Sequence, residues 1–261
     1  YCFFIVLTAW LLSSAIHTIV IMVITLIIFF LVFDTRYALK KFAKFFLLFV
    51  FMLSIQYSIY PNSVIYLQNK LQINNPTNPN GGFFGKIEFI KRTLVRITND
   101  ENFDKSIFGN GVGSYSSRAS YILSGEYLKN QKYIPIIKSK IFEKDLYDIW
   151  NKEKLEKNRW AHGVANQPFS SWVTILGEQG LIGLGFYSII FIWLIIKFRR
   201  EKMNFLNEVA ALSLIYLFVA LFFDNYLEYP RFMLPVFITV ILALVDLRYK
   251  PGKSLKNTIS F

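Results

Sequence analysis

Cysteine and histidine are scarce in this sequence, and both shortages narrow the chemistry open to it. The single cysteine, Cys2, cannot form an internal disulfide or a thiolate metal cluster. The two histidines are His17 and His162. A carboxylate cluster suited to a metal is missing as well, because the acidic residues near position 150 alternate with lysines, as in a solvated helix; they are Glu143, Asp145, Asp148, Glu153 and Glu156. We therefore expect no metal and no cofactor.

Charge is absent from the first 33 residues, and hydrophobic residues make up 54% of the chain, a composition typical of polytopic membrane proteins. As one helix, residues 1–33 would be about 50 Å long, more than a hydrocarbon core of about 30 Å accepts. We expect two crossings, divided near Ser13-Ser14 and His17. The start at Tyr1 carries neither a methionine nor a basic leader, so we expect the C-terminal part of a longer protein.

The hydropathy pattern predicts an all-α, polytopic transmembrane helix bundle with a large, mostly helical extracytoplasmic loop. After the truncated first crossing, the expected spans are 15–33, 45–60, 180–196, 209–223 and 233–247. The expected divisions are transmembrane helices in 1–60, the loop with the site in 61–168, three C-terminal transmembrane helices in 169–247 and a basic cytoplasmic tail in 248–261.

Three short basic blocks indicate the sidedness of the chain. They fall in 34–44, 197–202 and 248–256, on alternate connections. Short cationic connections stay in the cytoplasm, so the loop 61–168 and the turn 224–231 should share the opposite side. In a membrane protein, the net charge of +12 matters less than the position of each block, which makes nucleic acid a remote partner.

A cationic, amphipathic segment lies early in the loop. Between residues 86 and 97, apolar residues recur at helical spacing, and Glu88, Arg92 and Arg96 form a row four residues apart on the opposite face. Two interpretations remain open. The segment either rests on a membrane surface as a solvated helix, or it binds phosphate, because guanidinium groups match phosphate oxygens at two points.

Three further features are candidates for a site. The glycines of Phe108-Gly-Asn-Gly-Val-Gly-Ser-Tyr115 permit positive φ and close approach of backbone N–H groups to a ligand, although a tight structural turn is equally compatible. His162 has a side chain suited to deprotonating a sugar hydroxyl, and it also fits as an interfacial residue. Glu178, at the head of an apolar run, indicates function, a helix cap, or an ion pair with Arg118, Arg159 or Arg231.

Taken in order, three of these stretches resemble the O-antigen ligase and O-antigen polymerase superfamily of bacterial envelope glycosyltransferases. They are Lys86-Ile-Glu-Phe, the turn 108–115, and Trp172-Val-Thr-Ile-Leu-Gly-Glu-Gln-Gly-Leu-Ile-Gly183. The chain departs from the family pattern in two places, with Lys86 where arginine is frequent and Phe169-Ser170 where a His-Asn pair is frequent. The second departure favours a repeat-unit polymerase over a ligase.

The resemblance implies a metal-independent transferase at the outer face of the inner membrane, moving a glycan from a polyprenyl-diphosphate carrier to a glycan or lipid-linked acceptor. It implies that cationic side chains hold the diphosphate, for which we expect Arg92, Arg96 and Arg118, with Lys86 secondary. His162 or Glu178 is the expected base or acceptor-orienting group. A transporter of lipid-linked sugars would use the same cations without making bonds, and a membrane anchor for a partner-binding loop is a third possibility.

Overall fold

The structure is a computed structural model that describes residues 16–33, scattered helical positions from 43 to 58, and 83–98, 103–126, 135–148, 170–201 and 204–248. These ranges contain helices and loops and no strand. The α-helices are α2 (Ile16–Phe33), α5 (Phe83–Ile97), α6 (Phe103–Phe108), α7 (Arg118–Leu123), α9 (Ser171–Arg200), α10 (Phe205–Phe223) and α11 (Pro230–Arg248). A short π-helix, η2 (Phe142–Leu146), and a 3₁₀ turn, η4 (Tyr226–Glu228), complete the described elements.

Three helices are long and apolar enough to cross a membrane, namely α9, α10 and α11. Their outward side chains are largely Leu, Ile, Val and Phe, a surface compatible with lipid and not with water. The prediction of three long, apolar helices after residue 169 is therefore confirmed. The predicted span 15–33 coincides with α2 to within one residue. The truncated first crossing lies outside the described residues, and span 45–60 is described only at scattered positions.

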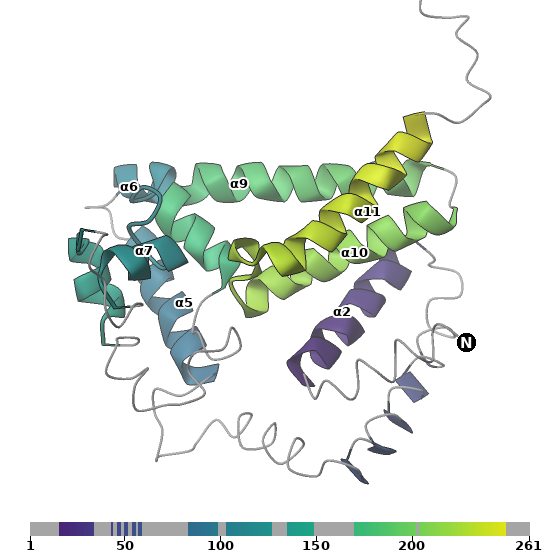
Figure 1. The fold of residues 1–261 in the computed structure, drawn as a ribbon, viewed down its shortest axis with the longest axis horizontal. Helices are drawn as coiled ribbons and strands as arrows, with labels where there is room; N and C mark the ends of the chain where they lie inside the picture. The colour runs from purple at the N-terminus through teal and green to yellow at the C-terminus, as the bar shows by residue number, and fades with distance from the viewer. Residues whose placement is uncertain are drawn as a thin grey trace, which may run out of the picture.

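Helix α10 is the centre of the bundle, because it packs against α2, α9 and α11 together (Figure 1). Its small and branched side chains are buried on several sides, with Ala210, Leu217 and Ala220 fully inaccessible. Trp172 of α9 packs on Phe218, and its indole N–H donates to the Phe218 carbonyl at 3.0 Å. The start of α9 is thereby fixed to the last turns of α10.

The polar segment, meaning the described parts of the loop 61–168, lies at one end of this bundle together with the turn between α10 and α11. In Figure 1, α5, α6 and α7 gather at the end where α9 begins. The Ser171 N–H donates to the carbonyl of Asp224, and the Arg118 N–H donates to the Glu228 carboxylate. The basic last turns of α9 and α11 lie at their opposite ends. The described parts of the loop therefore contact the turn 224–231, while the predicted side of the membrane for both stays a prediction.

Helix α9 begins nine residues before the predicted span and bends where that span was predicted to start. At Gly180 the backbone leaves the helical region, with φ 67° and ψ −164°. The preceding turns carry polar residues, including Ser171, Thr174 and Glu178, which lower the hydropathy and hide the helix from a sequence scan. The apolar residues 181–196 make roughly 24 Å of helix. The long side chains of the basic last turn extend this stretch to about the thickness of the hydrocarbon core, without the bent part.

A second, smaller core holds the polar segment together. Tyr115 stacks on Phe89 with ring centroids 5.8 Å apart, and Tyr121 meets Phe142 edge to face at 5.0 Å. Val173 of α9 packs against the same cluster, which ties it to the bundle. The described parts of the polar segment therefore form a packed body, the polar body, at the N-terminal end of α9.

Candidate functional site

The carboxylate of Glu178 holds the glycine turn in place. Its Oε2 accepts the N–H of Gly113 at 2.9 Å, and its Oε1 accepts the N–H groups of Tyr115 and Ser117, each at 3.2 Å. Only 4% of Glu178 is exposed, so this charge is compensated by backbone donors. An ion pair with an arginine was one of the predicted alternatives for Glu178. Among the described residues, which do not include Arg159, backbone N–H groups are the partners of its carboxylate. This arrangement gives Glu178 a positioning role.

The bend in α9 provides further acceptors for the same turn. Because Gly180 interrupts the helix, the carbonyls one turn earlier lose their intrahelical partners. The carbonyl of Glu178 accepts the Gly111 N–H at 2.9 Å. The carbonyl of Gly177 accepts both the backbone N–H of Asn110 at 3.2 Å and its side-chain amide at 2.6 Å. The bend and the turn therefore satisfy one another's backbone groups.

The predicted positive φ of the glycine turn is confirmed at Gly109, Gly111 and Gly113, with values of 78°, 92° and 77°. A side chain on Gly109 would overlap the carbonyl of Glu178, and one on Gly180 would overlap that of Ile107. The N–H groups of Gly111 and Gly113 point to Glu178 and not to an open cavity. In the turn, close backbone approach therefore serves the contact with α9.

The two arginines of α5 turn inward and form ion pairs with the segment around η2. Arg92 grips Asp148 at two points, Nη1 to Oδ1 at 2.7 Å and Nη2 to Oδ2 at 2.9 Å, and its Nε donates to Glu88 at 3.0 Å. These carboxylates raise the pKa of Arg92 although burial lowers it. Arg96 donates from Nη1 to Asp145 at 2.8 Å. The acidic residues expected to be solvated thus include two partners of this cationic row.

The two guanidinium groups differ in how many donors remain. Arg92 also donates from Nη1 to the Asp145 carbonyl, so four of its five N–H groups have a partner. Arg96 makes two hydrogen bonds, to Asp145 and to Asn110, and lies over the ring of Tyr115 at 5.7 Å. Three of its N–H groups make no hydrogen bond to the described residues. Arg96 is the better placed of the two to receive another anion.

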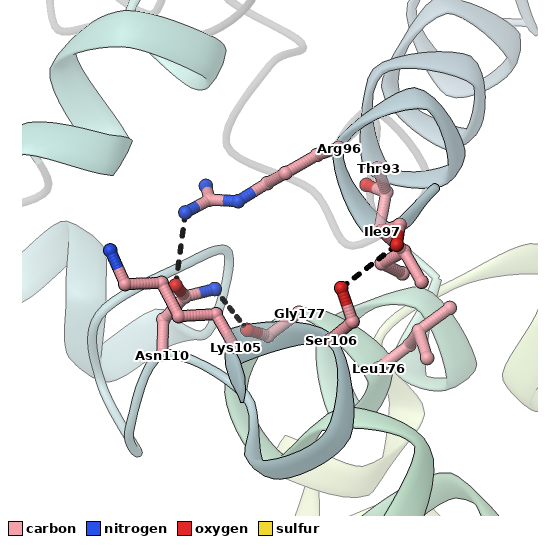
Figure 2. Close-up of a pocket in the computed structure, with 8 residues that line it drawn as sticks. All are labelled: Thr93, Arg96, Ile97, Lys105, Ser106, Asn110, Leu176 and Gly177. Carbon is pink, nitrogen blue, oxygen red and sulfur yellow. Dashed lines mark hydrogen bonds between the residues drawn. The ribbon is translucent and has the colours of Figure 1, made fainter. Parts of the chain in front are cut away.

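A small pocket opens beside Arg96, between α5, α6 and α9 (Figure 2). Asn110 lines the pocket and links α5 to α9, because its Oδ1 accepts from Arg96 and its Nδ2 donates to the carbonyl of Gly177. Figure 2 shows the Lys105 amine and the Arg96 guanidinium on the same side of the pocket. Lys105 and Asn110 were not predicted as site residues, because their position beside the pocket depends on the fold of α6 and of the turn and not on a local motif.

Arg118 lies apart from that pocket, at the start of α7. Its backbone N–H donates to both Glu228 oxygens at 2.8 Å, and its guanidinium lies 6.0 Å from the ring centre of Tyr229. Burial, together with the charge of Glu178, raises the pKa of Glu228 to about 7, while the Arg118 N–H and charge oppose the rise. The structure therefore associates Arg118 with the turn before α11 and separates it from the α5 row.

Two predicted site residues lie wholly or partly outside the described structure. Lys86 lies in the first turns of α5, and its side chain is outside the described part of the structure. His162 lies outside the described residues, so its expected role as a base stays a prediction. Within the described ranges, no group of three or more His, Cys, Asp or Glu side chains comes together as a metal site.

Comparison with family models, curated proteins and solved structures finds no match to this chain.

Proposed function

We propose that the protein is a membrane glycosyltransferase that polymerises or ligates oligosaccharide units carried on polyprenyl diphosphate, at the outer face of the bacterial inner membrane. One observation carries this proposal. The three stretches on which the family resemblance rests are far apart in sequence, yet α5, the turn 108–115 and the first turns of α9 meet in one packed body. That body sits at the end of helices long and apolar enough to span a membrane.

The proposed reaction places its main demand on charge. The acceptor hydroxyl oxygen bonds to the anomeric carbon of the donor, and the bond from that carbon to the diphosphate oxygen breaks, its electron pair leaving with the lipid diphosphate. The hydroxyl proton passes to a base, for which His162 remains the candidate. Negative charge grows on the departing diphosphate, so fixed cations lower the barrier. Arg96 and Lys105 beside the pocket supply such charge, with Arg92, Arg118 and Lys86 as further candidates.

The position of the bend in α9 favours a transferase over a transporter of lipid-linked sugars. Transporters of many folds bind substrate at broken helices near the bilayer midplane. Here the break at Gly180 precedes a segment that is long enough to span by itself, and the glycine turn uses the freed carbonyls of Gly177 and Glu178. The break at Gly180 is therefore expected at the edge of the membrane, where it holds the glycine turn and does not bind a transported substrate.

The decisive experiment is glycan transfer by purified protein in lipid vesicles, with a labelled polyprenyl-diphosphate oligosaccharide as donor. We expect longer or newly linked glycan and free lipid diphosphate. Lys105→Gln and Arg96→Gln should lower the rate, while Lys140→Gln, an exposed lysine outside the pocket, is the matched control. Movement of donor across the bilayer without a new glycosidic bond would identify a transporter. The absence of both transfer and transport would favour a membrane anchor.

Orientation has its own test. In a Cys2→Ser background, Lys140→Cys and Arg200→Cys place single thiols on the polar body and on the basic end of α9. An impermeant maleimide applied to intact spheroplasts should label position 140 and not position 200. The reverse pattern would show the proposed sidedness to be wrong.

A further inference from the structure

Helix α5 packs against the polar body with its arginine face, so its apolar side chains point away from that body. Its arginines, with Phe89 and Thr93, face the packed body, where Phe89 is 0% and Thr93 1% exposed. The opposite side presents a row of large apolar side chains. Their exposed fractions are 44% for Ile87, 37% for Ile90, 52% for Leu94 and 60% for Val95. In a water-soluble body, helical residues with these spacings would form the buried face.

The inward face is fixed by specific contacts, so the outward row cannot be a chance rotation of the helix. The Thr93 hydroxyl lies 2.6 Å from that of Tyr115, in the buried core of the polar body. Arg92 and Arg96 are held by Asp148 and Asp145 on the same side. Turning the helix to bury the apolar row would break these contacts together.

The location of α5 indicates what the row meets. Figure 1 shows α5 lying across the end of the bundle, crosswise to the long part of α9. Val173 of α9 packs against the small core that contains Phe89 of α5, and it precedes both the bend at Gly180 and the straight membrane-spanning part of α9. A helix crosswise to the spans and at the level of their ends lies in the plane of the membrane surface.

The charge on the outward face fits the same location. With both arginines turned inward, the cation exposed on the described outward face of α5 is Lys91, which lies four residues from both Ile87 and Val95 and so within the apolar face. At the headgroup boundary a lysine stem follows apolar surface while its amine reaches headgroup phosphates, so a lysine within such a face fits a membrane surface. An apolar protein surface packed on this face would bury the Lys91 amine without a partner, at a cost in solvation, whereas a lipid surface offers it headgroup phosphates.

We propose that α5 is an interfacial membrane helix whose residues Ile87, Ile90, Leu94 and Val95 enter the acyl boundary of the bilayer, with Lys91 at the headgroups. The helix then holds the pocket beside Arg96, on its inner side, close to the lipid surface. This inference rests on the membrane-spanning helices and stands whether or not the protein transfers glycan.

Spin-label accessibility in the full chain tests this proposal. In a Cys2→Ser background, Ile90→Cys and Leu94→Cys carry a nitroxide on the outward row, and Lys140→Cys carries it on an exposed polar position as the control. The protein is reconstituted in vesicles of phosphatidylcholine and phosphatidylglycerol. Relaxation by oxygen, which concentrates in lipid, is compared with relaxation by a water-soluble nickel chelate.

We expect both row labels to respond more to oxygen than to the nickel chelate, and the control label to show the opposite preference. A preference for nickel at positions 90 and 94 would overturn the proposal, because the row would then face water. Protection from both reagents would also overturn it, since another protein segment or a second copy would then cover the row. Both substitutions lie at exposed positions, and Val95→Cys provides a third label on the same face should either variant fail to fold.

Discussion

Gly109 and Gly180 face each other across a backbone contact that leaves no room for a side chain on either. A Cβ on Gly109 would collide with the carbonyl of Glu178, and one on Gly180 with the carbonyl of Ile107. Both residues also have positive φ, at 78° and 67°. The glycine turn and the bend of α9 can therefore pack together only if positions 109 and 180 are both glycine.

Alanine at either glycine should destabilise the protein strongly. Gly109→Ala and Gly180→Ala each combine overpacking with left-handed backbone strain, and we expect a cost of about 2–5 kcal/mol. Gly185→Ala is the control, because a Cβ there meets open space within helical backbone and should be neutral or mildly stabilising. Thermal unfolding in detergent measures all three, and equal midpoints would contradict the close contact.

Removing the charge of Glu178 should release the glycine turn. In Glu178→Gln one acceptor oxygen becomes a donor facing a backbone N–H, which we expect to cost about 1–3 kcal/mol. Hydrogen exchange should rise at Gly113, Tyr115 and Ser117 before the bundle itself opens. Glu143→Gln, at an exposed carboxylate, should leave that exchange unchanged. Loss of transfer with the turn still protected would instead indicate a catalytic Glu178.

Glu228 should make stability depend on pH. Folding raises its pKa from an ordinary 4.5 to about 7, chiefly through burial, so the folded protein holds a proton that the unfolded chain releases between these values. Its contribution is fully present below about pH 4.5 and is lost as the pH rises through 7. Glu228→Gln cannot titrate, so its unfolding midpoint should rise relative to wild type between pH 5 and pH 8. Parallel pH curves for the two proteins would refute this.

Charge-preserving changes should separate the roles of the arginines. Arg92→Lys loses the two-point grip on Asp148 and should lower stability, while Arg96→Lys loses the planar guanidinium beside the pocket and should lower glycan transfer more than stability. Arg118→Lys, at the turn before α11, should affect transfer only if the substrate reaches across from the pocket. Transfer per folded protein is the measurement, and full activity of Arg96→Lys would refute its diphosphate role.

Hydropathy was sufficient to locate the apolar helices, because the composition of a helix is enough to show that it can lie in lipid. The predicted spans 15–33, 209–223 and 233–247 fall within a few residues of α2, α10 and α11. The difference at α10 has a local cause, since the Asn204 side chain accepts the N–H of Asn207 and starts the helix earlier than the apolar run. Polar residues hid the first turns of α9 in the same way.

The site was less accessible to sequence reasoning, because its pairings join residues far apart in the chain. A helical pattern separates the two faces of α5 and does not say which one is covered. That choice depends on Asp145 and Asp148, which lie about 50 residues later. The partners of Glu178 were equally hidden, because backbone N–H groups have no sequence signature.

The hydrogen bond from Arg118 to Glu228 sets an order of events on the ribosome. Its acceptor lies 110 residues after its donor, which at ordinary synthesis rates is a delay of roughly 5–20 seconds. The Ser171 contact with Asp224 imposes a shorter delay of the same kind. During that interval, the polar body has left the ribosome while its seat on the bundle is still being made. These contacts between the polar body and the bundle therefore form only after the turn before α11 has been synthesised.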